Sequence, residues 1–200
     1  MTAISDEQLI LQAQSGQSEA FGLLVQRYQT AVFNVAYRMF GQAPDAEDAT
    51  QEAFVRAYKA IERFDSKRPF APWIKRITVN VCLNVLESKQ NQTQTVATDI
   101  KRDDQTQGDM DDWQHRNPTP EQNLVKQERD ILLREAILTL PPNYRAVLEY
   151  RHFQELTYDQ IAETMNRPVS SVKSDLFRAR KMLATRMKEE RRETRVESGK

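Results

Sequence analysis

Cysteine and histidine are almost absent from this sequence, which has one cysteine, Cys82, and two histidines among its 200 residues. A single cysteine excludes an internal disulfide and a cysteine-based zinc cluster, and two histidines provide too few ligands for an ordinary zinc site. We therefore expect no metal and no cofactor. Cys82 falls in a predicted helix without a partner residue, and we interpret it as an inert thiol.

Long apolar runs and glycine are also scarce. No stretch approaches the roughly 20 apolar residues that cross a membrane, and the N-terminus lacks the basic start and apolar run of a signal peptide. We therefore expect a soluble cytoplasmic protein without membrane insertion. Only five glycines occur, whereas Ala, Leu, Gln, Glu and Arg are plentiful, and this composition favours helices over sheets.

The net charge gives no sign of a nucleic-acid partner, because 29 basic residues are balanced by 29 acidic ones. Catalytic motifs are missing as well, since the sequence has no glycine-rich phosphate loop, no metal-ligand cluster and no nucleophile motif. Three neighbouring carboxylates, Glu47, Asp48 and Glu52, lack a histidine or metal partner. We interpret them as part of a docking surface and expect the protein not to be an enzyme.

Hydrophobic spacing predicts an all-α protein of two small helical domains joined by a flexible linker. The domains are expected at 1–90 and 121–188, with the linker at 91–120 and a charged, fraying tail at 189–200. The linker is rich in Gln, Thr and Asp and has almost no apolar periodicity.

Helix ends in the first domain are marked by short polar residues, glycine and proline. Ser5 and Gln8 form a capping box, and Ser18 is a second candidate cap. Gly41 and Pro44 are expected to end the second helix. Further helices are expected from about Asp45 and after the loop 64–69.

In the second domain, a helix that carries Leu124, Ile131 and Leu140 is expected to end at Pro141-Pro142. The second proline suits the first turn of the next helix, expected from Asn143 to Phe153.

The segment from 157 to 183 has the parts of a helix-turn-helix. Thr157 and Gln160 form a capping box for a short helix, and a longer helix is expected from Ser170 or Ser171. On this last helix an apolar stripe faces inward and comprises Val172, Leu176, Ala179 and Leu183.

The opposite face of the last helix has the chemistry of major-groove reading, because Lys and Arg can contact phosphate or guanine and Phe can meet a thymine methyl group. Between Arg167 and Arg192, nine basic residues stand against three acidic ones, a local net charge of +6. Asp175 would repel a phosphate unless it pairs with Arg178 or Arg180. An exposed helix of an ordinary bundle would show the same pattern. The outward set is Ser170, Ser174, Phe177, Arg178 and Lys181, with Lys173 and Arg180 on a flank.

The loop and helix that follow the third helix form a second candidate surface. Arg76, Asn80 and Asn84 recur at intervals of four and share one side of a helix, with Trp73 adjacent. Aromatic rings beside basic and amide side chains suit unstacked, single-stranded bases. The alternative is that the aromatic residues are core, which we favour for Phe70, and that the polar face is only solvated. Positive charge is added by Lys67, Arg68, Lys75 and Arg76.

Three segments, taken in this order, resemble extracytoplasmic-function (group IV) sigma factors of the sigma-70 family. The first is 45–58 (DAEDATQEAFVRAY) and the second is 70–80 (FAPWIKRITVN). The third is Leu140-Pro141-Pro142 with the helix-turn-helix through 171–180 (SVKSDLFRAR). Each segment alone is moderately specific, whereas the ordered set across a polar linker is highly specific. The resemblance covers nearly the whole chain except the linker and tail.

This resemblance implies a first domain, like sigma domain 2, that docks on the clamp helices of the polymerase β′ subunit and melts and reads the −10 promoter element. Capturing a base outside the duplex offsets roughly a few kcal/mol of unstacking. The implied docking residues are Asp48, Gln51, Glu52 and Arg56. The implied −10 contacts are Phe64, Lys67, Arg68, Trp73, Arg76, Asn80 and Asn84.

The resemblance also implies a second domain, like sigma domain 4, that places its last helix in the major groove of the −35 element and contacts the polymerase β flap. Many relatives carry a basic residue where this chain has Asp175, which puts a phosphate contact there in doubt. The implied partners are core RNA polymerase, promoter DNA and an anti-sigma factor, and the acidic linker suits a path near the RNA exit. The implied −35 contacts are Ser171, Lys173, Ser174, Phe177, Arg178 and Lys181.

A helix-turn-helix regulator that binds DNA without core polymerase is the alternative function. It accounts for 121–188 but leaves the acidic helix at 45–58 and the face of Trp73, Arg76 and Asn80 unexplained. Such regulators typically dimerise on palindromic sites. A monomer that needs core polymerase for tight promoter binding would therefore argue against this alternative.

Overall fold

The computed structural model describes residues 4–93 and 131–197, with side chains described for 4–89 and 131–188. Both described parts are helical, and neither contains a strand, so the predicted all-α fold is confirmed. Most of the linker expected at 91–120, and the start of the helix expected after it, lie outside the described residues.

The first unit consists of α1 (Asp6–Gln14), α2 (Ser18–Phe40), α3 (Ala43–Ala60), the short 3-10 helix η1 (Ile61–Arg63) and α4 (Phe70–Thr93). The predicted capping box begins α1, because the side chains of Ser5 and Gln8 each accept a hydrogen bond from the other residue's backbone. Gly41 ends α2 with a φ of 79°, as predicted. The prediction for Ser18 is wrong, since it is the first residue of α2 and no side chain caps that helix at Gln17.

The inner face of α3 consists of four alanines and Phe54, and α3 packs mainly against α2. Pro44 lies in the first turn of α3, where its missing N–H leaves no bond unmade. The helix therefore begins two residues before Asp45, at Ala43. The small buried residues of this face are Ala46, Ala49, Ala53 and Ala57.

The second unit consists of a helical segment at 131–138, α6 (Pro142–Leu148), the π-helical turn η3 (Glu149–Phe153), α7 (Tyr158–Met165) and α8 (Val169–Glu197). Pro142 opens α6, as predicted. The prediction of one α-helix from Asn143 to Phe153 is wrong in its second half. From Glu149 the chain forms the π-helical turn η3, which is wider than an α-helix, and Glu149 and Tyr150 are buried there. The last helix begins one residue before the expected start and continues past 188, where the tail was expected.

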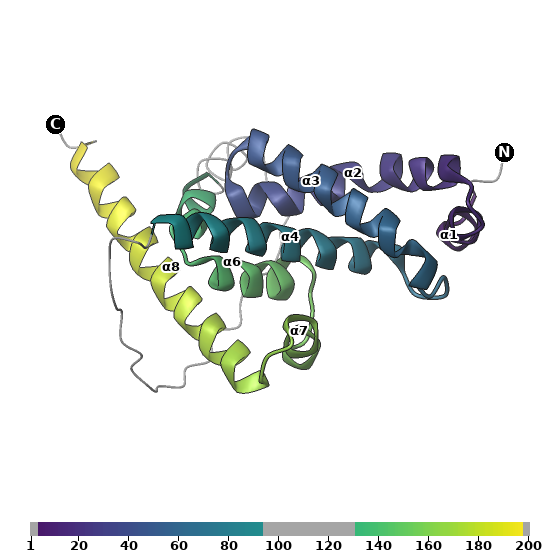
Figure 1. The fold of residues 1–200 in the computed structure, drawn as a ribbon. Helices are drawn as coiled ribbons and strands as arrows, with labels where there is room; N and C mark the ends of the chain where they lie inside the picture. The colour runs from purple at the N-terminus through teal and green to yellow at the C-terminus, as the bar shows by residue number, and fades with distance from the viewer. Residues whose placement is uncertain (1–3, 94–130, 198–200) are drawn as a thin grey trace, which may run out of the picture.

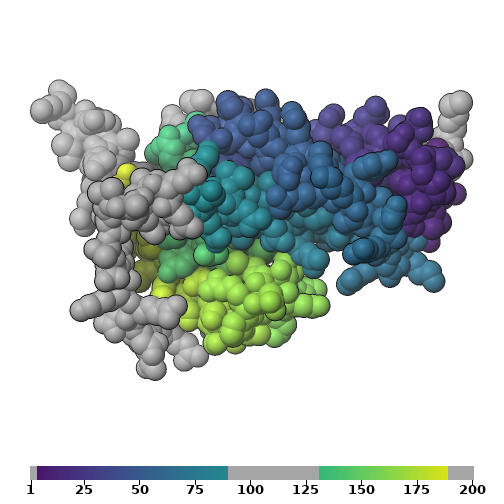
Figure 2. Space-filling model, viewed as in Figure 1, coloured from purple at the N-terminus to yellow at the C-terminus, as the bar shows by residue number. Residues whose placement is uncertain are grey.

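The two units pack directly against each other, with α4 between α2 and α3 on one side and α6 on the other (Figure 1). In the space-filling view, the second unit lies against the first along α4 (Figure 2). The Arg38 guanidinium of α2 donates two hydrogen bonds to the Glu149 carboxylate, at 2.7 and 2.9 Å, and lies 4.3 Å from the centre of the Phe153 ring. The buried apolar residues of the two units also form one continuous core.

Candidate nucleic-acid interface

Three aromatic rings meet where the loop 64–69 joins α4. The Phe64 ring centre lies 4.3 Å from that of Trp73 and 6.1 Å from that of Phe70, which it meets edge-on. Phe70 is fully buried, in line with the core interpretation. Phe64, predicted as a DNA contact, is only 9% exposed and supports Trp73 from the buried side. Trp73 is half-buried and is therefore the ring of the three that a base can best reach.

A tight turn shapes the loop after Phe64. Oδ1 of Asp65 accepts a hydrogen bond from the backbone N–H of Lys67 at 3.0 Å, and the Asp65 carbonyl accepts one from the N–H of Arg68 at 2.9 Å. A short carboxylate that bonds the backbone two residues further on is a common turn former. The turn leaves Lys67 and Arg68 exposed, where their charges can meet phosphate.

Arg76, Asn80 and Asn84 form what we call the α4 stripe. All three are exposed, as their spacing predicted, while Cys82 on the other side of the helix is fully buried. Arg76 lies close enough to Tyr150 of the second unit for its charge to oppose the rise in that phenol's pKa, which burial causes. The stripe therefore begins beside Trp73 and borders the second unit.

α7 and α8 form the predicted helix-turn-helix. Thr157 and Gln160 make the predicted capping box at the start of α7. Asn166 ends α7 in the left-handed conformation, at a φ of 50°, which Asn tolerates better than most residues. The N–H of Arg167 then donates to the Ala162 carbonyl at 2.9 Å and closes the turn.

The faces of α8 divide as the spacing predicted. Val172, Leu176 and Ala179 are buried, and Leu183 packs against the same core. Of the residues expected to contact DNA or flank the contacts, the exposed ones are Ser170, Lys173, Ser174 and Lys181. The half-buried ones are Ser171, Phe177, Arg178 and Arg180.

Asp175, which would repel a phosphate if it were unpaired, has a partner in the structure. It is 7% exposed, and its Oδ2 lies 2.6 Å from Nη1 of Arg167, in an ion pair by distance rather than an aligned hydrogen bond. The partner that the structure gives Asp175 is thus Arg167 of the turn. Because the carboxylate is withdrawn from the surface and paired, it leaves the outward face of α8 to basic and hydroxyl side chains.

The residues expected to dock on the polymerase form a separate polar face on α3. Nε of Arg56 lies 2.7 Å from Oε1 of Glu52, one helical turn away. An exposed pair of this kind is weak and can rearrange around a partner. An open groove between α2 and α3 lies nearby and is lined partly by Phe33 and Gln51. The exposed members of the expected set are Asp48, Gln51, Glu52 and Arg56.

Sequence reasoning missed the side chain that holds the start of the loop. Nε2 of Gln14, at the end of α1, donates to the carbonyl of Ile61 at 2.8 Å and to that of Phe64 at 2.7 Å. The partners lie 47 and 50 residues further along the chain. No local pattern could therefore have indicated these bonds.

The fold and its two polar faces define a two-unit helical protein of the helix-turn-helix class. Residues 24–92 match the Sigma-70 region 2 family, and residues 130–183 match the Sigma-70, region 4 family. The chain is 32% identical to the RNA polymerase sigma-H factor of Pseudomonas aeruginosa, over 92% of this chain and 94% of that one. It is also 32% identical to the ECF RNA polymerase sigma-E factor of Haemophilus influenzae, over 92% and 96% of the two chains.

A third relative, the ECF RNA polymerase sigma factor SigW of Bacillus subtilis, is 31% identical over 90% of this chain and 95% of its own length. The chain therefore belongs to the ECF family of RNA polymerase sigma factors, as its three motifs predicted. Its function is that of a sigma factor in transcription initiation.

Two solved structures share the fold. CnrH, in complex with the cytosolic domain of CnrY, gives a TM-score of 0.56 at 22% identity, over 92% of this chain and 97% of that one. RpoE of Bartonella quintana, in complex with the anti-sigma factor NepR, gives 0.56 at 16%, over 84% and 96%. Neither described part of this chain has a helix long and apolar enough to cross a membrane.

Proposed function

We propose that this sigma factor reads the −10 element with the loop 64–69, Trp73 and the α4 stripe, and the −35 element with the outward face of α8. The observation that carries the proposal is the exposure of two separate polar faces, one on each unit, at the positions that the family motifs occupy. We also propose that the protein acts in the cytoplasm and has no catalytic activity of its own.

At the −10 element, the geometry suits a base that has left the duplex. Trp73 offers a ring for stacking, and the α4 stripe offers amide groups that can pair with base edges. Lys67 and Arg68 are placed to hold the phosphates of the same strand. Phe64 is excluded from the proposed contacts because it is buried under Trp73.

At the −35 element, α8 presents side chains suited to the major groove. Lys173, Ser174 and Lys181 are exposed, and Phe177 and Arg178 are partly so. An arginine that reads guanine with two hydrogen bonds contributes about 1–3 kcal/mol of discrimination. Pairing of Asp175 with Arg167 removes a source of phosphate repulsion. Ser171 lies at the start of this helix and is half-buried.

Docking on the polymerase is proposed for the α3 face, with the β′ clamp helices as partner, and for the second unit with the β flap. An anti-sigma factor is the proposed regulator. Support comes from the CnrH and RpoE structures, which hold the cytosolic domain of CnrY and the anti-sigma factor NepR, respectively. The α3 face and the groove beside it are open to a partner in this chain.

The test is run-off transcription with purified core polymerase and a promoter library randomised at the −10 and −35 elements. We expect initiation only when the protein is present, with defined bases enriched at both elements. Specific binding to a palindromic duplex by a dimer of the protein alone, without promoter-specific initiation, would support the helix-turn-helix regulator instead.

Two variants test, in the same experiment, which face of the protein reads which promoter element. Asn80→Ala is expected to weaken the base preference at −10 and leave core binding intact. Arg178→Ala is expected to weaken the preference at −35 by about 1–3 kcal/mol. An unchanged promoter profile for Arg178→Ala would remove that residue from the contacts, and loss of core binding by Asn80→Ala would make Asn80 a structural residue.

A further inference from the structure

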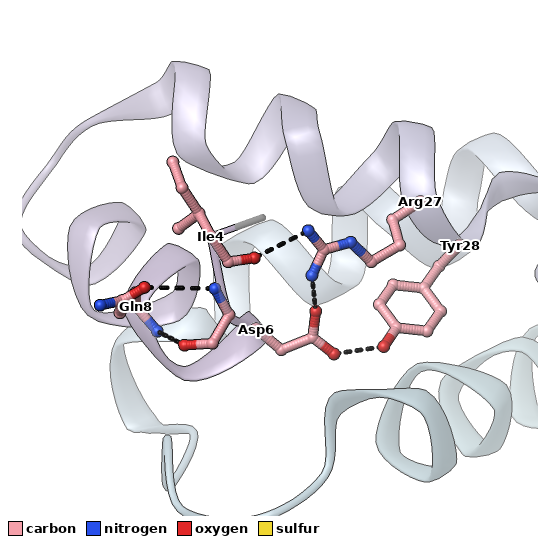
Figure 3. Close-up of polar contacts among 6 residues, drawn as sticks. Ile4, Asp6, Gln8, Arg27 and Tyr28 are labelled. Atoms are coloured by element: carbon pink, nitrogen blue, oxygen red, sulfur yellow. Dashed lines mark hydrogen bonds and ion pairs between the residues drawn. The ribbon is translucent and has the colours of Figure 1, made fainter. Parts of the chain in front are cut away.

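Helix α1 lies outside the residues that match Sigma-70 region 2, yet it is firmly tied to the first unit. Asp6 pairs with Arg27 and accepts a hydrogen bond from the hydroxyl of Tyr28 (Figure 3). Arg27 also donates to the carbonyl of Ile4 at 2.9 Å. The apolar face of α1 is buried. Helix α1 is therefore held at its start by these polar contacts and along its length by its buried residues, and another segment can be held against it.

Gln14, at the end of α1, holds both ends of η1. Its amide nitrogen carries two hydrogens, and they meet the carbonyls of Ile61 and Phe64, the first residue of η1 and the residue after it. At Phe64 the backbone becomes extended, with φ −78° and ψ 132°, and the loop begins. Gln14 thus sets the direction in which the chain leaves η1.

The direction of the chain at Phe64 determines where the side chains proposed to contact the −10 element lie. The Phe64 ring supports Trp73, and the turn at Asp65 that exposes Lys67 and Arg68 starts at the next residue. Recognition of a base depends on placement to within about 0.5 Å. A small shift of the loop origin would therefore change base reading more than it changes the packing of the unit.

We propose that Gln14 is a positioning residue for −10 recognition, which touches no DNA and acts by fixing the loop 64–69 against Trp73. The inference rests on the proposed −10 role of this loop. It adds α1 to the recognition apparatus, although this helix precedes the residues that match Sigma-70 region 2.

The test compares Gln14→Glu, Gln14→Met and Gln17→Glu in the full-length protein. Glutamate keeps the shape but cannot donate to the two carbonyls, and methionine removes the donors without adding charge. Gln17 is exposed and its side chain caps nothing, so Gln17→Glu controls for the added negative charge. Run-off transcription with core polymerase uses competing templates that differ only at −10 or only at −35, and core affinity and thermal unfolding are measured alongside.

We expect both Gln14 variants to lose about tenfold in discrimination between −10 templates, comparable to one mismatched base pair. Discrimination at −35, core affinity and the behaviour of Gln17→Glu should match the unaltered protein. Combining Gln14→Met with Trp73→Ala should reduce −10 discrimination no further than Trp73→Ala alone, because Gln14 is proposed to act by placing the loop against that ring.

A uniform loss of transcription with −10 discrimination intact would make Gln14 a stabilising residue only and overturn the proposal. The same conclusion would follow if both variants lost cooperative unfolding, or if the losses from Gln14→Met and Trp73→Ala were independent. Absence of −10 discrimination in the unaltered protein would instead refute the proposed function of the loop.

Discussion

The ion pair between Arg167 and Asp175 joins the turn of the helix-turn-helix to its second helix. The Arg167 side chain is 33% exposed, whereas that of Asp175 is 10% exposed. A carboxylate withdrawn from water in this way keeps its charge at low cost only beside a cation. We infer that the pair fixes the angle at which α8 leaves the turn, and with it the direction of the outward face.

Replacing Asp175 by Ala is expected to lower the stability of the second unit by about 1–2 kcal/mol, because Arg167 loses its partner but can still turn toward water. The double variant Arg167→Ala/Asp175→Ala should lose less than the sum of the single changes. Urea denaturation followed by circular dichroism measures both. Glu163→Ala, an exposed change on α7, is the control and should shift stability by less than about 0.5 kcal/mol. Unaltered stability with a changed −35 preference would place Asp175 at the DNA.

Single residues were predictable where their partners are close in sequence. The capping boxes at Ser5 and Thr157 each depend on a residue three positions further on, so the sequence alone indicated them. Arg38 and Glu149 are 111 residues apart, and only the folded chain brings them together. The ion pair of Asp175 was missed for a related reason, since its partner lies in a turn and off the helical spacing.

Two glycines in left-handed conformations end helices in the first unit, but their surroundings differ. Gly16 follows α1 with a φ of 93°, and nothing lies within 4 Å of where its Cβ would be. Gly41 follows α2 with a φ of 79°, and a Cβ there would lie 2.2 Å from Cδ1 of Leu138 in the second unit. The end of α2 is therefore both a helix cap and a contact between the units.

Alanine at each glycine separates these two roles. Gly16→Ala should lower stability by roughly 1–2 kcal/mol, the cost of a left-handed residue with a side chain. Gly41→Ala should cost the same plus the clash with Leu138, and Leu138→Ala should relieve the added part. Thermal unfolding of Gly16→Ala, Gly41→Ala, Leu138→Ala and the double variant Gly41→Ala/Leu138→Ala measures the difference. Equal losses for Gly16→Ala and Gly41→Ala would mean that the contact at Leu138 yields without cost.

At the scale of elements, periodicity predicted which helices exist and which face of each is buried. The inward stripe of α8 and the exposed α4 stripe both follow from spacing alone. The π-helical turn after α6 was missed, because its wider geometry places Glu149 and Tyr150 against the first unit. A feature created by packing between distant segments leaves no mark in local hydrophobic spacing.

The two units are packed against each other, whereas the two promoter elements lie far apart on the DNA. Positions −35 and −10 are about 25 base pairs apart, or roughly 85 Å of duplex. The longest helix of the first unit, α4, has 24 residues and spans about 36 Å. If the two faces read the two elements at once, as proposed, we expect the units to separate and the bonds of Arg38 to Glu149 to break.

Cys82 lies at the contact that such a separation would open. Its thiol is fully buried, and burial, with the Glu149 charge adding to it, raises its pKa to about 12. Only the thiolate reacts rapidly. The packed arrangement therefore protects Cys82 in two ways, because it keeps reagents away from the thiol and keeps the thiol protonated. In the opened arrangement the pKa would fall back toward its ordinary value of 9.0. As the only cysteine in the chain, Cys82 reports opening without any introduced label site.

Maleimide labelling of Cys82, measured by mass spectrometry of its peptide, should be slow in the free protein and faster when core polymerase binds. Arg38→Ala should speed labelling about tenfold or more without polymerase, because losing the hydrogen bonds to Glu149 costs about 1.5–3 kcal/mol. Arg27→Ala, which removes a charge from the same helix but from a pair with Asp6, is the matched control and should leave labelling slow. Protection that persists in a transcribing complex would mean that the units stay packed, and the expected separation of the two units on the promoter would then be wrong.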